Sequence, residues 1–233
     1  MKEELQPLLQ RFCHILWAFS VIGVITLALA FWLGDARAVA LVHAAGWTRA
    51  HYSFLLAFTD LGLYPFYVLF LVLFAWGYLR NDHDLKLLAQ GYLLAQFLGS
   101  ALMVSIIKIS LGRARPDATT LPDFGSQWAG FRWDAAHHSF PSGHTADIVT
   151  GALFAALLFR SPLAVAACIT WAAAVGLSRL AVAKHYPSDA LTGAVIAVGV
   201  SMLVLRYWLL PRLTRLRGGV GVRWWRSGGE NRC

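Results

Sequence analysis

Charge is scarce in this sequence: 14% of its 233 residues are charged, whereas a soluble domain has about 25%. Hydrophobic residues make up 58%, and the mean hydropathy is +0.57. So few charges could not cover a soluble core of this size, and a chain this apolar is not intrinsically disordered. The composition predicts an integral membrane protein.

Cysteine is equally scarce, and Cys13, Cys168 and Cys233 are dispersed along the chain. Three cysteines without ligand spacing give neither a disulfide framework nor a zinc site, so we interpret them as packing thiols. The net charge of +8 would suit nucleic acid, but the long apolar runs favour anionic lipid headgroups as the partner instead. We therefore expect no nucleic-acid partner.

Long apolar runs are what the sequence does contain. A helix that crosses the roughly 30 Å hydrocarbon layer needs about 20 mainly apolar residues. Six stretches approach that length: Ile15–Leu33, Leu61–Leu79, Leu87–Ile107, Ser142–Phe159, Leu163–Leu177 and Ala190–Leu210. We predict an all-α, polytopic membrane protein, a single bundle of six transmembrane helices spanning residues 1–233.

The distribution of Lys and Arg predicts the orientation, since cytoplasmic loops are richer in these residues. With both termini in the cytoplasm, 12 of the 20 basic residues lie on that side, many of them in the basic tail 211–233. The run Ala28-Leu29-Ala30 resembles a signal-peptide cleavage site. A retained first helix is the preferred interpretation, because the apolar run is longer than a usual signal-peptide core.

Polar residues gather in three segments. They are Lys108 to Pro116, Pro141 to His144, and Ser178 to Asp189. In a six-helix topology all three lie on connections at the non-cytoplasmic face. We expect segments far apart in the chain to form one site there.

The chemistry of these segments is that of a phosphoryl site. Lys108, Arg115 and Arg179 form a cationic set, and arginine binds phosphate through paired hydrogen bonds. Pro141 suits the start of a helix, where the free amides of Ser142 and Gly143 would face an anion. The remaining groups, two histidines and one aspartate, suffice for a nucleophile, its orienting carboxylate and a general acid.

The three segments resemble the motifs of the type 2 phosphatidate phosphatase superfamily, the lipid phosphate phosphatases. The family pattern is K-x6-R-P, P-S-G-H and S-R-x5-H-x3-D. It is matched here at every position from Lys108 to Asp189. The resemblance covers about Leu61–Leu210, and within the family this sequence is most similar to bacterial lipid A 1-phosphatases.

The resemblance implies roles for the catalytic residues. His185 would attack phosphorus and become a phosphohistidine, while Asp189 would hold its other ring nitrogen. His144 would protonate the leaving oxygen and then activate water. The phosphate oxygens would be held by Lys108, Arg115, Arg179, Ser142 and Gly143. The family needs no metal and no cofactor.

Other polar residues keep alternative interpretations. Arg113 would contact a second phosphate or sugar, or else lipid headgroups. Asp147 would steer His144, pair with an arginine, or be neutral through burial. Asp60 would support the site or cap a helix, with the cap preferred. Three further cations on this face, Arg37, Arg49 and Lys184, are interpreted as ordinary interfacial residues.

The predicted function is a lipid phosphatase of the bacterial inner membrane, with its active site facing the periplasm. Lipid A 1-phosphate is the favoured substrate, and undecaprenyl diphosphate and phosphatidylglycerophosphate remain alternatives. A phosphotransferase would use the same residues. A transporter is disfavoured because the charges cluster at one face rather than at mid-bilayer depth. The oligomeric state is not readable from the sequence. The aromatic residues of the 111–140 loop fit an interfacial belt or a lid equally well.

Overall fold

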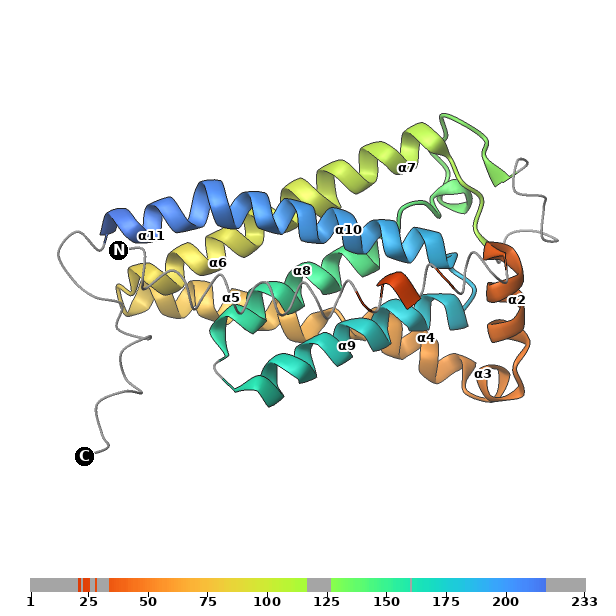
Figure 1. Ribbon diagram of the computed structural model, residues 1–233, viewed down its shortest axis with the longest axis horizontal. Coiled ribbons are helices and arrows are strands. Elements are labelled where there is room, and N and C mark those ends of the chain that lie inside the picture. Colours follow the sequence, from red (N-terminus) through yellow and green to blue (C-terminus); the bar gives the residue numbers. More distant parts are fainter. Residues whose placement is uncertain are drawn as a thin grey trace.

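The computed structural model describes residues 21, 23–25, 28, 34–116, 127–159 and 161–216. The predicted first span, Ile15–Leu33, and the tail beyond residue 216 lie almost wholly outside these ranges. The described part consists of helices joined by turns and loops, with one isolated β-bridge between Arg113 and Trp128. It forms an elongated bundle (Figure 1). The predicted all-α membrane class is therefore confirmed.

Within the described ranges, four helical stretches are long and apolar enough to cross a membrane: Tyr52–Leu79, His83–Leu111, Pro162–Ala181 and Pro187–Leu213. The first contains α4 (Tyr52–Leu61) and α5 (Tyr64–Leu79), and the second α6 (His83–Gln96), the π-helix η1 (Phe97–Val104) and α7 (Ser105–Leu111). The third is α9 (Pro162–Ala181), and the last joins α10 (Pro187–Leu203), η5 (Val204–Leu209) and α11 (Leu210–Leu216). They correspond to four of the six predicted spans. The count of six and the cytoplasmic termini stay predictions.

Helix α8 (Gly143–Leu158) is shorter and lies inside the bundle. It packs against α5, α6, α9 and α10, which surround it in Figure 1. Its side chains are buried on all faces from Thr145 to Leu157, apart from Asp147, as expected for a helix that is apolar all round. Gly151 permits close packing, because a Cβ there would meet the Phe66 ring. The central helix thus carries the second predicted motif at its N-terminus.

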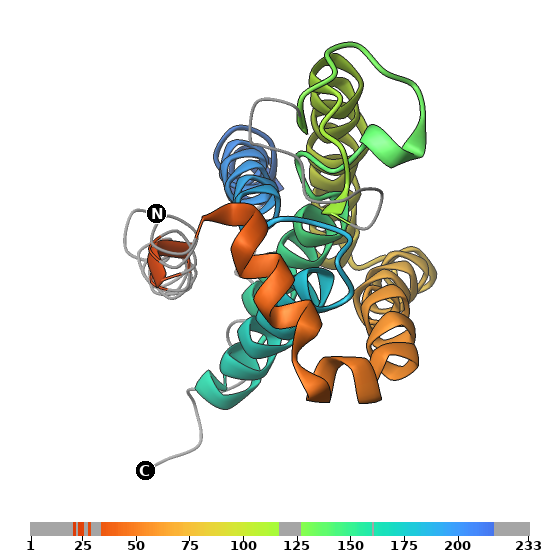
Figure 2. The same cartoon turned by 90° about the vertical axis from the view of Figure 1, so that its right-hand side faces the viewer.

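Two short helices, α2 (Asp35–Ala44) and α3 (Gly46–Ala50), cross one end of the bundle, as the end-on view of Figure 2 shows. Val39 of α2 packs on Ala183 and Tyr186. This covered end is where α7 and α9 finish and where α8 and α10 begin. All three predicted motifs lie there.

Local sequence signals set these helix ends. Gly112 ends α7 with φ +54°, a left-handed conformation that glycine adopts without strain. Ser142 is the N-cap of α8, and its hydroxyl oxygen accepts the amide hydrogen of Thr145. Pro187 occupies the first turn of α10, where its missing N–H costs no hydrogen bond. The motif residues are therefore held at ordered helix termini.

Candidate active site

The three motifs, far apart in the chain, are joined by direct contacts. The backbone amide of Ser142 donates to the carbonyl of Asp189 at 2.9 Å, so it is not free to face an anion as predicted. Gly193, one turn further along α10, lies so close to Ser142 that a Cβ there would collide with the Ser142 carbonyl. A Cβ on Gly143 would lie 3.3 Å from Lys108 Nζ. The convergence predicted from the sequence is present in the structure.

His185 is buried at 1% exposure and is held by one short hydrogen bond. Its Nδ1 lies 2.7 Å from the carbonyl oxygen of Ser139. A carbonyl only accepts, so Nδ1 carries the proton and Nε2 keeps its lone pair. Burial lowers the pKa of His185 to about 4, with Arg179 and Lys108 acting in the same direction. The imidazole is therefore neutral near pH 7, as a nucleophile must be.

Asp189 lies beside His185, with Oδ2 3.6 Å from Nδ1. This carboxylate is fully buried. Its Oδ2 accepts from the Ser139 hydroxyl at 2.5 Å and from the Tyr186 amide at 2.9 Å. The Ser139 carbonyl, rather than Asp189, makes the short bond to the ring, and Asp189 supplies the nearby negative charge. Asp189 is thus placed to stabilise a positive charge that forms on His185.

Ser139 was missed by the sequence interpretation. Its carbonyl contacts His185 and its hydroxyl contacts Asp189, so one residue links the two. A serine three positions before Ser142 matches no motif. No sequence signal could have identified it, because half of its role belongs to the backbone.

His144 and Arg179 share a partner in Asp60. Oδ1 of Asp60 lies 3.4 Å from Nε2 of His144. The same oxygen accepts a hydrogen bond from Nη1 of Arg179 at 3.3 Å. Asp60 is in the last turn of α4, and the cap of the next helix is Leu63 without a side-chain bond. The preferred interpretation of Asp60 as a helix cap is wrong, and the alternative of support for the site fits these contacts.

The predicted phosphate-binding cations lie close to one another. Lys108 interacts electrostatically with both Arg115 and Arg179. Arg115 is half-buried, and its Nε donates to the Ala135 carbonyl at 2.9 Å. Three like charges repel, so a bound anion would stabilise this cluster. Among the described residues, no three His, Cys, Asp or Glu side chains are grouped so that they could hold a metal ion.

Arg113 is buried at 0% exposure and cannot contact a headgroup as predicted. Its guanidinium donates to Asp189 Oδ1 at 2.5 Å and to Asp35 Oδ2 at 2.7 Å. It also donates to the side chains of Gln127 and Ser188. Arg113 therefore ties α2, through Asp35, to the carboxylate that faces His185.

Asp147 lies one turn into α8, and its carboxyl is hydrogen-bonded by the side chains of Tyr67 and Ser100. These partners belong to α5 and η1. Asp147 thus links three helices below the site, and neither His144 nor an arginine is among these hydrogen-bond partners.

Comparison with known proteins agrees with this geometry. Residues 87–212 match the model of the PAP2 superfamily. The chain is 40% identical over 116 residues to lipid A 1-phosphatases of Rhizobium johnstonii and Rhizobium etli, a match that covers 48% of this chain. It is 37% identical over 128 residues, 53% of this chain, to that of Porphyromonas gingivalis.

These matches span 45% and 47% of the Rhizobium proteins and 25% of the Porphyromonas protein. No solved structure matches the chain. The family model covers more than half of the chain and all three motifs. The chain therefore belongs to the PAP2 superfamily.

Proposed function

We propose that this protein is a membrane phosphatase that removes phosphate from a lipid headgroup through a phosphohistidine on His185. The contact that carries the proposal is the hydrogen bond from His185 Nδ1 to the Ser139 carbonyl. It leaves a neutral Nε2 as the nucleophile in a site that contains Lys108, Arg115 and Arg179. Family membership and the names of the relatives support phosphate chemistry on a lipid.

The first step transfers the phosphoryl group to the enzyme. Nε2 of His185 attacks phosphorus in line as the bond from phosphorus to the lipid oxygen breaks. His144 gives a proton to the leaving oxygen. The imidazolium that forms is stabilised by Asp189, whose Oδ2 is 3.6 Å from Nδ1. The cations, with the Ser142 hydroxyl and the Gly143 amide at the start of α8, hold the phosphoryl oxygens.

The second step returns the enzyme to its starting state. His144, now neutral, takes a proton from a water molecule that attacks the phosphohistidine. The bond from nitrogen to phosphorus breaks, its electron pair returns to Nε2, and inorganic phosphate leaves. Asp60 positions His144 and Arg179 through the oxygen that both contact. In this mechanism His144 serves as acid and base in turn.

Lipid A carrying a 1-phosphate is the proposed substrate, and undecaprenyl diphosphate and phosphatidylglycerophosphate are the alternatives. The proposed location is the bacterial inner membrane, with the site at the periplasmic face and both termini in the cytoplasm. The basic residues counted above support that orientation. Transfer to a second lipid in place of water is the remaining alternative for the same site.

The test is phosphate release by the purified full-length protein from each of the three lipids, without an acceptor lipid. We expect release from lipid A, and acid-labile labelling of the protein when a phosphorus-labelled lipid is mixed and quenched rapidly. His185→Ala should abolish both signals, whereas His144→Asn should slow release by about 10²–10⁴-fold. Undiminished turnover in His185→Ala would contradict the mechanism. Inactivity on all three lipids with activity on glucose 6-phosphate would contradict the lipid substrate.

A further inference from the structure

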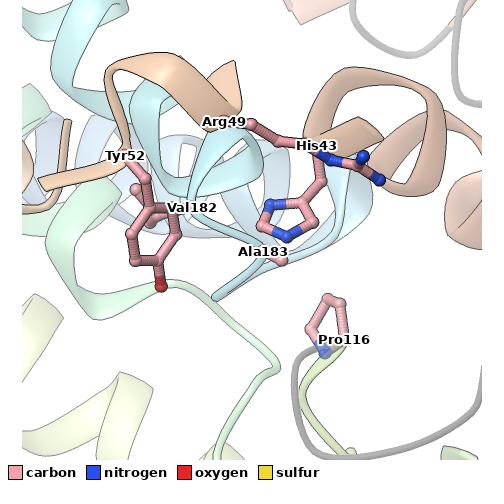
Figure 3. A pocket seen from close by; sticks show the side chains of 6 residues that line it. All are labelled: His43, Arg49, Tyr52, Pro116, Val182 and Ala183. Atoms are coloured by element: carbon pink, nitrogen blue, oxygen red, sulfur yellow. The ribbon is translucent and has the colours of Figure 1, made fainter. Parts of the chain in front are cut away.

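A cavity of about 450 Å³ lies at the end of the bundle that α2 and α3 cover. Its wall contains His43, Arg49, Tyr52, Pro116, Val182 and Ala183. In Figure 3 the side chains of His43, Arg49 and Tyr52 lie on one side of this space, and Pro116 lies across from them. The volume is within the range of small-molecule sites, about 300–1,000 Å³, and exceeds what one phosphate group needs.

The polar groups on this wall have unused hydrogen-bonding capacity. Within the described ranges, the Arg49 guanidinium and the Tyr52 hydroxyl have neither a hydrogen-bond nor an ion-pair partner. His43 Nδ1 lies 3.1 Å from the Ala181 carbonyl, so Nδ1 donates and Nε2 remains available. A cation that pairs with no acid of the described residues, beside a hydroxyl and an imidazole, favours an anionic or hydroxyl-rich ligand.

The cavity adjoins the residues of the proposed reaction. Pro116 directly follows Arg115, and Ala183 precedes His185 by two residues. Two peptide units span at most about 7 Å, so the Cα atoms of Ala183 and His185 lie no further apart than that. We therefore expect a headgroup whose phosphate contacts Arg115 and His185 to extend toward this wall.

We propose that this cavity is a second headgroup subsite, in which Arg49, with His43 and Tyr52, binds an anionic group of the substrate other than the phosphate that is removed. The inference rests on the proposed function and makes it more specific. It selects lipids whose headgroup carries two separate anionic groups, such as a disaccharide with a phosphate at each end. The second-phosphate role predicted for Arg113 passes to Arg49, because Arg113 is fully buried and Arg49 is exposed.

The experiment compares two substrates and two variants of the full-length protein in zwitterionic detergent micelles. The substrates are lipid A with both phosphates and the analogue that keeps only the 1-phosphate. Arg49→Gln removes the proposed anion contact. Arg37→Gln is the matched control, since Arg37 is an exposed cation of the same covering segment that does not line the cavity.

We expect the KM of Arg49→Gln for the bisphosphorylated lipid to rise about 5- to 30-fold, with kcat nearly unchanged. For the monophosphorylated lipid, the KM and kcat of Arg49→Gln should stay within about twofold of the wild-type values. The KM and kcat of Arg37→Gln should stay within the same limit for both lipids. Equal effects of Arg49→Gln on the two substrates would overturn the subsite. The subsite would also be overturned if Arg49→Gln changed KM only after anionic lipid was added to the micelles, because Arg49 would then bind bulk lipid. If the wild type hydrolyses neither substrate, the proposed function itself fails; if it hydrolyses both and Arg49→Gln acts normally, the subsite alone fails.

Discussion

One carboxylate oxygen of Asp60 lies 3.4 Å from Nε2 of His144. The same oxygen accepts a hydrogen bond from Arg179 at 3.3 Å. Asp60 precedes the region that matches the family model, residues 87–212. A helix outside the motif region thus supplies a carboxylate to two motif residues. The relationship predicts that Asp60 adjusts proton transfer by His144 while it is not itself part of the reaction.

Asp60→Asn should lower kcat near pH 7 by about 3- to 10-fold, a modest effect because the carboxylate is 58% exposed and its charge is screened. His144 is also faced by Lys108, Arg179 and His185, all of which disfavour its protonated form when charged. Without the Asp60 carboxylate, the alkaline limb of the kcat profile should move to lower pH.

The measurement is the pH dependence of kcat for Asp60→Asn, with Asp134→Asn as the control. Asp134 is an exposed acid at the same end of the bundle, and it pairs with His137. A uniform loss of kcat at every pH would mean that Asp60 has only a structural role.

Gly193→Ala should reduce activity because the new methyl group would collide with the Ser142 carbonyl and displace the start of α8. We expect kcat to fall at least about tenfold, since a misplacement of about 1 Å in a reacting group costs about 10²-fold. Gly199→Ala is the matched control in the same helix, because nothing lies within 4 Å of its added Cβ. That variant should be fully active and slightly more stable, as alanine is the better helix former. Equal activity of the two variants would show that the contact between α8 and α10 has no role in positioning the site.

Arg113→Met should destabilise the fold by about 3–5 kcal/mol, because it leaves the buried Asp189 carboxylate and Asp35 without their shared cation. Arg132→Met, at an exposed cation of the same loop, should cost little. The measurement is the midpoint of thermal unfolding in detergent. If Arg113→Met does not fold, Arg113→Lys should fold with a lowered midpoint, since lysine keeps the charge and loses the forked geometry. A midpoint for Arg113→Lys equal to that of the wild type would contradict the prediction.

The stability of the protein should fall as the pH is lowered through the titration of His185. The pKa of this group is about 4 in the folded state and about 6.5 in the unfolded state. The unfolded state therefore binds more protons between these values, and stability is lost as the pH falls from about 6.5 to about 4. His185→Asn should flatten this part of the curve of unfolding midpoint against pH. An unchanged slope in the variant would contradict the assignment of the buried, neutral imidazole.

The membrane class and the catalytic motifs could be predicted because they depend on local patterns. A run of apolar residues needs a lipid environment wherever it packs, and the motif spacing places Asp189 four residues beyond His185, in the first turn of α10. The helix ends were also signalled locally, by Gly112, Ser142 and Pro187. The beginning of the second span was placed too late, at Leu61 rather than Tyr52, because Asp60 interrupts the apolar run.

The surroundings of the motifs could not be predicted, since each contact joins residues that are distant in the chain. Arg113 was expected at a headgroup but is buried between Asp35 and Asp189. Asp60 was expected to cap a helix but contacts His144. A charged residue gives the same pattern in a sequence whether its partner is water, lipid or a buried acid, and only packing decides among these.

The order of the residues along the chain is sufficient to identify the family motifs and the candidate reacting groups, because the proposed phosphoryl transfer needs particular side chains at helix termini. It does not determine which nitrogen of His185 is free. That depends on the Ser139 carbonyl, which reaches the ring only because α8 and α10 pack closely where Gly193 leaves room. The cavity beside the site likewise exists only because α2 and α3 fold over the end of the bundle.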